Sequence, residues 1–300
     1  MTADHALGAD QPPIEPGAVR LRVADLASQR EFYERALGLR TLDDGEGIVT
    51  LGVDETSVVE LVSSPAAPQR PPGTTGLFHL AILVPGRAAL AEAFARVAGA
   101  GWRLTGASDH LVSEALYLND PEGNGIEIYR DRPRSEWRYD GGGLQMSTLP
   151  LDLDGLLGEL PGSDSADAGM LAGTRIGHVH LNVADIGVAE DFYAGLLGFD
   201  VTVRGYPGAL FLSTGDYHHH VGVNTWAGPG APAPPEGSRG LVWFELRVAD
   251  AGTVEELCAR LEGSGAEVEA VPEGVGTRDP SGNGILIRDS DSATGGLSTA

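Results

Sequence analysis

The chain has 300 residues, of which 42% are apolar and 21% charged, and its formal net charge is −23 at pH 7. This length and apolar content suffice for one large domain or two of ordinary size. The acidic excess argues against a protein that follows nucleic-acid phosphates, because such binding needs clustered Lys and Arg. No apolar run approaches about 18 residues, the length of a membrane span, and residues 1–17 lack the basic start and apolar core of a signal peptide. We therefore expect a soluble, cytoplasmic protein without nucleic-acid or membrane partners.

The first part of the chain presents one plan twice. Apolar and polar residues alternate as in a half-buried strand, a helical pattern follows, and further strand-like stretches come after it. The predicted strands are 18–23, 47–53, 57–62, 77–84, 114–120 and 125–131, and the predicted helices are one around residues 32–33 and one at 87–101.

The last part of the chain presents the same plan twice more. The predicted strands are 178–183, 209–214, 220–225, 241–248 and 284–290, and the predicted helices are one around residues 192–193 and one at 251–265. The whole pattern corresponds to four βαβββ modules.

Two internal repeats relate the halves to each other. Residues 19–40 (VRLRVADLASQREFYERALGLR) and 179–200 (VHLNVADIGVAEDFYAGLLGFD) align without a gap at an offset of 160 and share nine of 22 positions. A second repeat relates residues 120–129 (DPEGNGIEIY) to residues 279–288 (DPSGNGILIR). Such self-similarity indicates repeated structural units.

We predict three regions: a first domain at 17–131, a polar, Gly-rich linker at 132–173 and a second domain at 174–290. A strand unit of this size cannot bury its own face, so the modules should pair edge to edge. The predicted fold class is α+β, with the four modules paired into two curved mixed-sheet half-barrels that enclose a metal cavity.

Equivalent positions of the modules differ in polarity. The matched residues on the first strands are Ala18, His79, His178 and Trp243, and those on the last strands are Glu60, Glu127, Asn224 and Leu286. His79, Glu127 and His178 stand where other modules carry Ala, Leu or Trp. Two histidines at equivalent strand starts, together with a carboxylate in an otherwise apolar strand, favour a metal-binding role over an ordinary core role.

Three adjacent histidines, His218, His219 and His220, precede the strand at 220–225. Successive side chains of a strand point to opposite faces, so all three can hardly bind one ion. If the strand runs unbroken to Asn224, His218 and His220 share its face and His219 points away. A turn or bulge would reset this phase, so His218 and His219 both stay candidates for a proton-transfer role.

The chain resembles the vicinal oxygen chelate superfamily (the glyoxalase/bleomycin resistance/dioxygenase fold), and in particular its two-domain extradiol dioxygenases of the catechol 2,3-dioxygenase type. The resemblance covers nearly all of residues 17–289. The motif DPEGNGIEIY is shared across the superfamily, whereas FLSTGDYHHHVGVN after GHVHLNVADI is more specific to the extradiol enzymes.

The resemblance implies roles for particular residues. The metal ligands would be His79, Glu127 and His178. The acid–base residue would be His219, with His218 as a second candidate. Tyr117, ten residues before Glu127, and His110 would contact substrate oxygens.

The implied reaction is Fe(II)-dependent extradiol ring cleavage of catechol or a small substituted catechol, giving a 2-hydroxymuconic-semialdehyde-type product. The partners would then be a small aromatic diol and dioxygen. Mn(II) is an alternative to Fe(II), and the sequence leaves open whether copies of the chain form a homo-oligomer. Two other functions stay open: a glyoxalase-like isomerase or lyase, and a metal-free binding protein.

The chain differs from these extradiol enzymes in where its candidate ligands lie. Extradiol enzymes of this type build their site within the C-terminal half, whereas here the ligands are divided between modules 2 and 3. We expect these two modules to share a cavity, with modules 1 and 4 forming a metal-free pair. Sequential pairing would instead join Glu60, His79 and Glu127, a set closer to a glyoxalase-like isomerase. The histidine trio favours the first arrangement, because it lies in the same module as His178.

Overall fold

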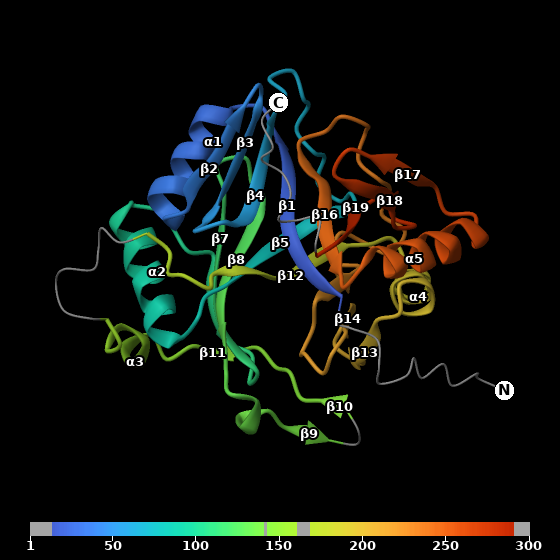
Figure 1. The fold of residues 1–300 in the computed structure, drawn as a ribbon. Coiled ribbons are helices and arrows are strands. Elements are labelled where there is room, and N and C mark those ends of the chain that lie inside the picture. The colour runs from blue at the N-terminus through green and yellow to red at the C-terminus, as the bar shows by residue number, and fades with distance from the viewer. Residues whose placement is uncertain (1–13, 141–142, 161–168, 291–300) are drawn as a thin grey trace.

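Figure 1 shows the computed structural model of the chain, in which residues 14–140, 143–160 and 169–290 are described. The elements fall into four units of one order: a first strand, a helix and three further strands. No helix in this part of the chain is long and apolar enough to cross a membrane. The predicted α+β class and the four βαβββ modules are confirmed.

Modules 1 and 2 lie before residue 132. Module 1 contains β1 (Glu15–Val23), α1 (Leu26–Phe32), the π-helical turn η1 (Tyr33–Leu37), β2 (Arg40–Gly45), β3 (Ile48–Val53) and β4 (Thr56–Ser63). Module 2 contains β5 (Gly76–Leu83), α2 (Arg87–Gly99), β6 (Gly106–Asp109), β7 (Ser113–Asn119) and β8 (Gly125–Asp131).

Modules 3 and 4 follow a segment of short elements. These are η2 (Arg134–Glu136), β9 (Tyr139–Asp140), β10 (Gly143–Leu144), β11 (Leu149–Pro150) and α3 (Leu153–Leu157). Module 3 contains β12 (Arg175–Asn182), α4 (Ile186–Glu190), the π-helical turn η3 (Asp191–Leu196), β13 (Asp200–Val203), β14 (Ala209–Ser213) and β15 (Val221–Asn224). Module 4 contains β16 (Gly240–Val248), α5 (Ala251–Gly263), β17 (Val268–Val271), β18 (Gly274–Arg278) and β19 (Gly284–Asp289).

The modules pair crosswise into two curved sheets (Figure 1). The eight-stranded sheet has the order β17-β18-β19-β16-β1-β4-β3-β2 and therefore joins module 4 to module 1. The nine-stranded sheet has the order β11-β6-β7-β8-β5-β12-β15-β14-β13 and joins module 2 to module 3. In each sheet the central pair is antiparallel, β1 with β16 and β5 with β12. The expected pairing of modules 2 and 3 is confirmed.

The two repeated motifs hold the sheets together. Tyr33 Oη lies 3.4 Å from Asp120 Oδ2, and Tyr193 Oη donates a hydrogen bond of 3.0 Å to Asp279 Oδ2. Each tyrosine follows the repeated phenylalanine in a π-helical turn, and each aspartate opens a DPxGNG turn. Because each contact joins two modules that belong to different sheets, the motifs recur for a structural reason.

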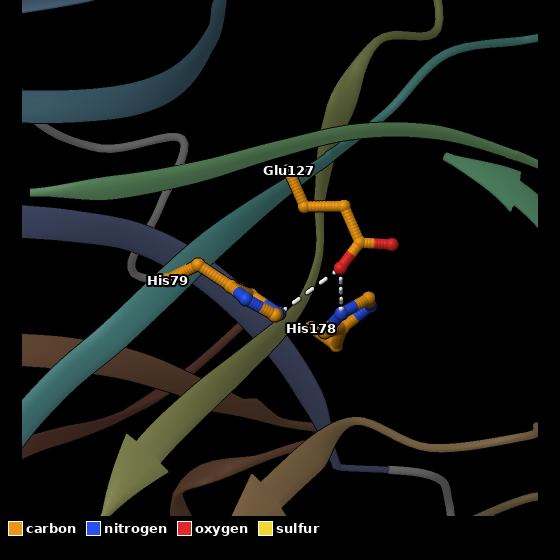
Figure 2. A group of neighbouring side chains, drawn as sticks. All are labelled: His79, Glu127 and His178. Atoms are coloured by element: carbon orange, nitrogen blue, oxygen red, sulfur yellow. Dashed lines mark hydrogen bonds and ion pairs between the residues drawn. The ribbon is translucent and has the colours of Figure 1, made fainter. Parts of the chain in front are cut away.

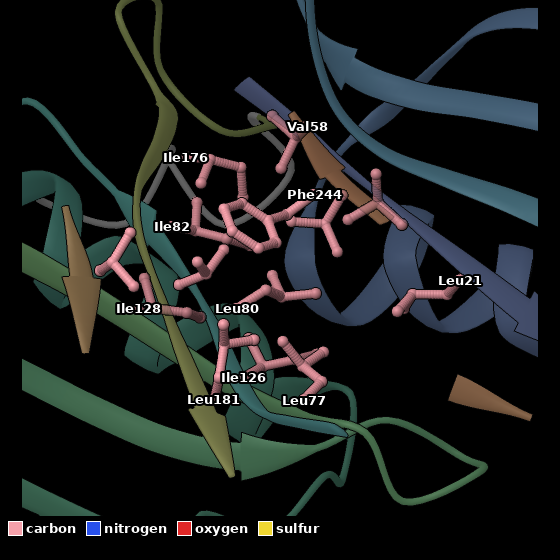
Figure 3. Close-up of a cluster of buried hydrophobic side chains, with 14 of the residues drawn as sticks. Leu21, Val58, Leu77, Leu80, Ile82, Ile126, Ile128, Ile176, Leu181 and Phe244 are labelled. Atoms are coloured by element: carbon pink, nitrogen blue, oxygen red, sulfur yellow. The ribbon is translucent and has the colours of Figure 1, made fainter. Parts of the chain in front are cut away.

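The main hydrophobic core joins the facing sides of the two sheets (Figure 3). Leu21 and Phe244 enter it from the eight-stranded sheet, and Leu80, Ile82 and Ile128 enter it from the nine-stranded sheet. Successive residues of a strand point to opposite faces, so Ala81, between Leu80 and Ile82, projects away from this core. That second face of the nine-stranded sheet carries the polar residues predicted from the sequence.

Leu21→Ala should lower the free energy of unfolding by about 2–5 kcal/mol, because it deletes buried methyl groups and leaves a cavity. Leu171→Ala makes the same chemical change at a side chain that is 40% exposed, and it should change that free energy by less than about 0.5 kcal/mol. Urea unfolding followed by circular dichroism compares the two variants. Equal losses would contradict the position of Leu21 in the core.

Candidate metal centre

Three side chains from neighbouring strands converge on one point (Figure 2). His79 comes from β5, Glu127 from β8 and His178 from β12. His79 Nε2 lies 3.0 Å from Glu127 Oε2, and His178 Nε2 lies 3.2 Å from the same oxygen. All three residues are buried, and their ligand atoms lie within 4.8 Å of one another. The fold thus brings together two imidazoles and one carboxylate from both halves of the chain.

Strand pairing explains this convergence. β5 runs antiparallel to β12 and parallel to β8, and Ala81 of β5 lies opposite both His178 and Glu127. His79 precedes Ala81 by two residues and therefore projects from the same face. Because Ala81 ends at its Cβ atom, it adds no bulk between the three polar side chains.

Burial and neighbouring groups favour the ligand forms that a metal requires. Burial lowers the pKa of His178 to about 4, so this imidazole is neutral near pH 7. Burial alone would raise the pKa of Glu127, but His178 and His79 hold it well below its usual range. His79 Nε2 is buried and, apart from its ion-pair contact with Glu127 Oε2, has no hydrogen-bond partner among the described residues. The neutral His178 imidazole, the Glu127 carboxylate and the His79 ring nitrogen form a donor set that fits a divalent cation.

The eight-stranded sheet places an arginine at the corresponding point. Arg20 of β1 occupies the position equivalent to Ala81, beside Glu60 and opposite Trp243. Arg20 Nη2 lies 2.7 Å from Glu60 Oε2, and the guanidinium lies over the Trp243 ring at 4.5 Å. A cationic side chain therefore neutralises the carboxylate in this sheet.

One matched position in module 3 is wrong. The sequence comparison assigns Asn224 to the position of Glu127, but the strand pairing assigns Gly222. Gly222 pairs with His180 of β12 in the same way that Glu127 pairs with Ala81 of β5. Residues two apart share a face of a strand, so alternation alone cannot distinguish them. The His180 ring lies over Gly222, where an added Cβ would come within 3.0 Å of His180 Cγ.

The candidate metal group lines a cavity of about 460 Å³. Phe78 and Trp226 pack edge to face at 5.1 Å, and they are 40% and 46% exposed, which puts them toward the mouth of the cavity. Tyr206 and Phe211 contribute further aromatic wall. The segment predicted as a linker also lines the cavity, through Met146, Ser147 and Thr148.

The histidine trio lies in the loop before β15, which begins only at Val221. The strand therefore does not run through the trio, and its alternation does not apply there. His219 lines the cavity, with its ring centroid 4.1 Å from that of His178. Burial lowers the pKa of His219 well below its usual range. His218 lies behind it, fully buried, and the His220 ring nitrogen Nδ1 contacts Ser213 Oγ at 3.0 Å.

Tyr117 and His110 form a second polar group on the cavity wall. Tyr117 lies directly across from Glu127 in the pairing of β7 with β8. Tyr117 Oη and His110 Nε2 are 2.7 Å apart, and His110 Nδ1 is 2.7 Å from the carbonyl oxygen of Ser147. Because that carbonyl only accepts, Nδ1 carries the proton in a neutral His110, and the Tyr117 hydroxyl donates to Nε2.

His180 is a cavity residue that the sequence comparison missed. It is 3% exposed, it lines the cavity, and its Nε2 has no hydrogen-bond partner among the described residues. It follows His178 by two residues, so strand alternation in GHVHLNV already places both on one face. In the eight-stranded sheet, the residue equivalent to His180 is Glu245, which pairs with Leu286 of β19 as His180 pairs with Gly222 of β15.

The repeated modules, the crossed pairing and the buried ligand group can be compared with known proteins. Residues 15–128 and 175–289 match the Glyoxalase/Bleomycin resistance protein/Dioxygenase superfamily. The chain belongs to this superfamily. The resemblance to vicinal oxygen chelate proteins is therefore confirmed.

Two relatives have dioxygenase names. Catechol-2,3-dioxygenase of Bacillus subtilis (strain 168) is 38% identical over 271 residues, which are 88% of this chain and 93% of that protein. Biphenyl-2,3-diol 1,2-dioxygenase 3 of Rhodococcus globerulus is 28% identical over 114 residues, which are 37% of this chain and 60% of that protein. By the first similarity, this superfamily member is a catechol 2,3-dioxygenase-like oxidoreductase.

Solved structures share the fold. A structure from Bacillus subtilis aligns with 93% of this chain and 86% of its own at a TM-score of 0.65 and 15% identity. Glyoxalase I from Zea mays aligns with 93% of each chain at a TM-score of 0.57 and 15% identity. Likeness at this identity concerns the fold and not the reaction.

The donor set predicts that each chain binds a single divalent ion in this group. His178→Ala should weaken binding by more than the ~10–100-fold typical of losing a group that only supports a ligand. His220→Ala is the matched control, since His220 is also a buried histidine but contacts Ser213. Competition with a chromophoric chelator under nitrogen measures both affinities. Native affinity in His178→Ala would contradict the assignment.

Proposed function

We propose that this protein is an Fe(II)-dependent extradiol dioxygenase that opens the ring of catechol or a small substituted catechol. The observation that carries the proposal is the buried group of His79, Glu127 and His178 on the wall of a cavity that also contains the His219 imidazole. Similarity to a catechol-2,3-dioxygenase supports the substrate class. Bound Fe(II) would supply open positions for two catechol oxygens and dioxygen, and would lower the pKa of the catechol hydroxyls.

The side chains around the ligand group would transfer protons, bind the substrate and exclude water. His219 would accept a proton from a catechol hydroxyl and return it as the ring opens, because its lowered pKa leaves the imidazole neutral and able to accept a proton. The Tyr117 hydroxyl, which donates to His110, keeps lone pairs that accept a hydrogen bond from the second catechol hydroxyl. Phe78 and Trp226 would flank the aromatic ring and exclude water.

The overall reaction needs no further reductant. Catechol and dioxygen combine so that the carbon–carbon bond beside the diol breaks and both oxygen atoms enter the product, a 2-hydroxymuconic-semialdehyde-type acid. The electrons come from the aromatic diol itself. This balance agrees with a cavity that has room for one small aromatic substrate and for dioxygen.

The position of Gly222 favours this reaction over a glyoxalase-like isomerisation. Such isomerases usually use a fourth protein ligand, and the crossed pairing assigns the fourth equivalent position to a residue without a side chain. Two imidazoles and one carboxylate are left, which is the ligand set typical of Fe(II) oxygenases.

Protein purified anaerobically and loaded with Fe(II) should consume one dioxygen per catechol and produce a yellow ring-cleavage product. An oxygen electrode and the visible spectrum follow both events. His178→Ala should abolish both, and protein loaded with Mn(II) tests the choice of metal. A fully Fe(II)-loaded protein that gives neither oxygen uptake nor colour would contradict the proposal.

His219→Gln should lower kcat by about 10²–10⁴-fold, the usual contribution of a positioned acid–base group. Its iron content should stay unchanged, because His219 is not among the three ligands. His220→Gln serves as the control within the same trio and should keep kcat within a small factor of the native value. A native kcat in His219→Gln would exclude this acid–base role.

A further inference from the structure

We propose that Asp131 and His218 are positioning residues that hold His219 in one tautomer, with its Nε2 lone pair presented to the cavity. The inference rests on the proposed function, because it explains how His219 would be ready to accept a proton. Two contacts carry it, and they form a continuous chain from Asp131 at the end of β8 to His219 on the cavity wall.

The chain of contacts is short and direct. His218 Nε2 lies 2.9 Å from Asp131 Oδ1, and His218 Nδ1 lies 2.7 Å from His219 Nδ1. An ionised carboxylate only accepts hydrogen bonds, so His218 Nε2 carries the proton and donates to Asp131. In a neutral His218 this is the only N–H, and Nδ1 is then the acceptor. The hydrogen between the two Nδ1 atoms therefore belongs to His219.

The tautomer of His219 follows from this assignment. With its proton on Nδ1, a neutral His219 has an unprotonated Nε2. Nε2 lies on the edge of the ring away from His218, and His219 lines the cavity. The catalytic lone pair would thus face the space where the diol binds, whereas the opposite tautomer would present an N–H there.

The surroundings hold His218 in place. Its ring is fully buried, and ring centroids of Tyr217 and Trp137 lie 4.1 and 5.5 Å away. Tyr217 Oη is 3.0 Å from both carboxylate oxygens of Asp131 and 2.8 Å from Tyr129 Oη. A ring flip of His218 would break its contacts with both neighbours, so the chain has one stable arrangement.

Asp131 is well placed to serve as the anchor. It is the last residue of β8, four positions after Glu127, so the two carboxylates project from the same face of one strand. One strand would therefore set both the metal-binding carboxylate and the orientation of the acid–base residue. This arrangement agrees with the general rule that a base is oriented by a third group.

The test reads the tautomer directly. Metal-free, full-length protein labelled with ¹⁵N-histidine gives long-range ¹H–¹⁵N spectra in which Nδ1–H and Nε2–H imidazoles differ, and the His219→Gln spectrum assigns the signals of His219. We expect the Nδ1–H form in native protein. His218→Phe, which keeps an aromatic ring but removes the acceptor, and Asp131→Ala should shift His219 to a mixture or to the Nε2–H form. His220→Gln should leave it unchanged.

Kinetics give a second reading on the loaded enzyme. Asp131→Ala should lower kcat by about 10–100-fold, the usual effect of losing an orienting partner, with little change in KM or iron content. Asp131→Glu, which keeps the carboxylate, should recover part of the loss. A structural defect alone would change iron content or KM and would not respond to the carboxylate.

The outcomes separate this inference from the proposed function. An Nε2–H form of His219 in native protein, or a tautomer that persists in His218→Phe and Asp131→Ala, would overturn the positioning role even if catechol is cleaved. Absence of catechol cleavage with the expected tautomer shifts would instead reject the proposed reaction and leave the hydrogen-bonded chain intact.

Discussion

The antiparallel pairing of β5 with β12 is the contact on which the rest of the site depends. It joins module 2 to module 3 and sets His79 and His178 on one face of a continuous sheet. β8 runs beside β5 and adds Glu127 to the same face. Neither half of the chain contains all three residues, so the group exists only when the two halves fold together. The repeated tyrosine–aspartate contacts between the sheets support this crossed arrangement.

The two sheets differ in how they compensate the charge of a carboxylate on the last strand of a module. A buried carboxylate is costly unless a cation or several hydrogen bonds compensate it. In the eight-stranded sheet, Arg20 compensates Glu60. In the nine-stranded sheet the equivalent residue is Ala81, and the Glu127 carboxylate lies beside His79 and His178 instead of an arginine. An external cation would supply there the positive charge that an arginine supplies in the other sheet.

The features that the internal repeats encode could be predicted from the sequence. The orientation of side chains near the start of a strand could not. The module order and the equivalence of His79 with His178 follow from aligned patterns, and the crossed pairing follows from how ligand types are divided among modules. The phase of the histidine trio depends on β15 beginning only at Val221, which local alternation does not reveal. Asn224 was assigned in place of Gly222 because the two residues lie on the same face of β15, and alternation does not distinguish them. The part of the connecting segment near Ser147 reaches the cavity through tertiary contacts that its polar composition does not predict.

Anomalous diffraction at the iron edge, from crystals grown anaerobically with Fe(II), tests the central claim most directly. The crossed pairing predicts a single strong peak per chain, within bonding distance of His79 Nε2, His178 Nε2 and a carboxylate oxygen of Glu127. A peak elsewhere, or no peak there in protein that contains stoichiometric iron, would contradict the claim that β5, β8 and β12 together build the metal centre.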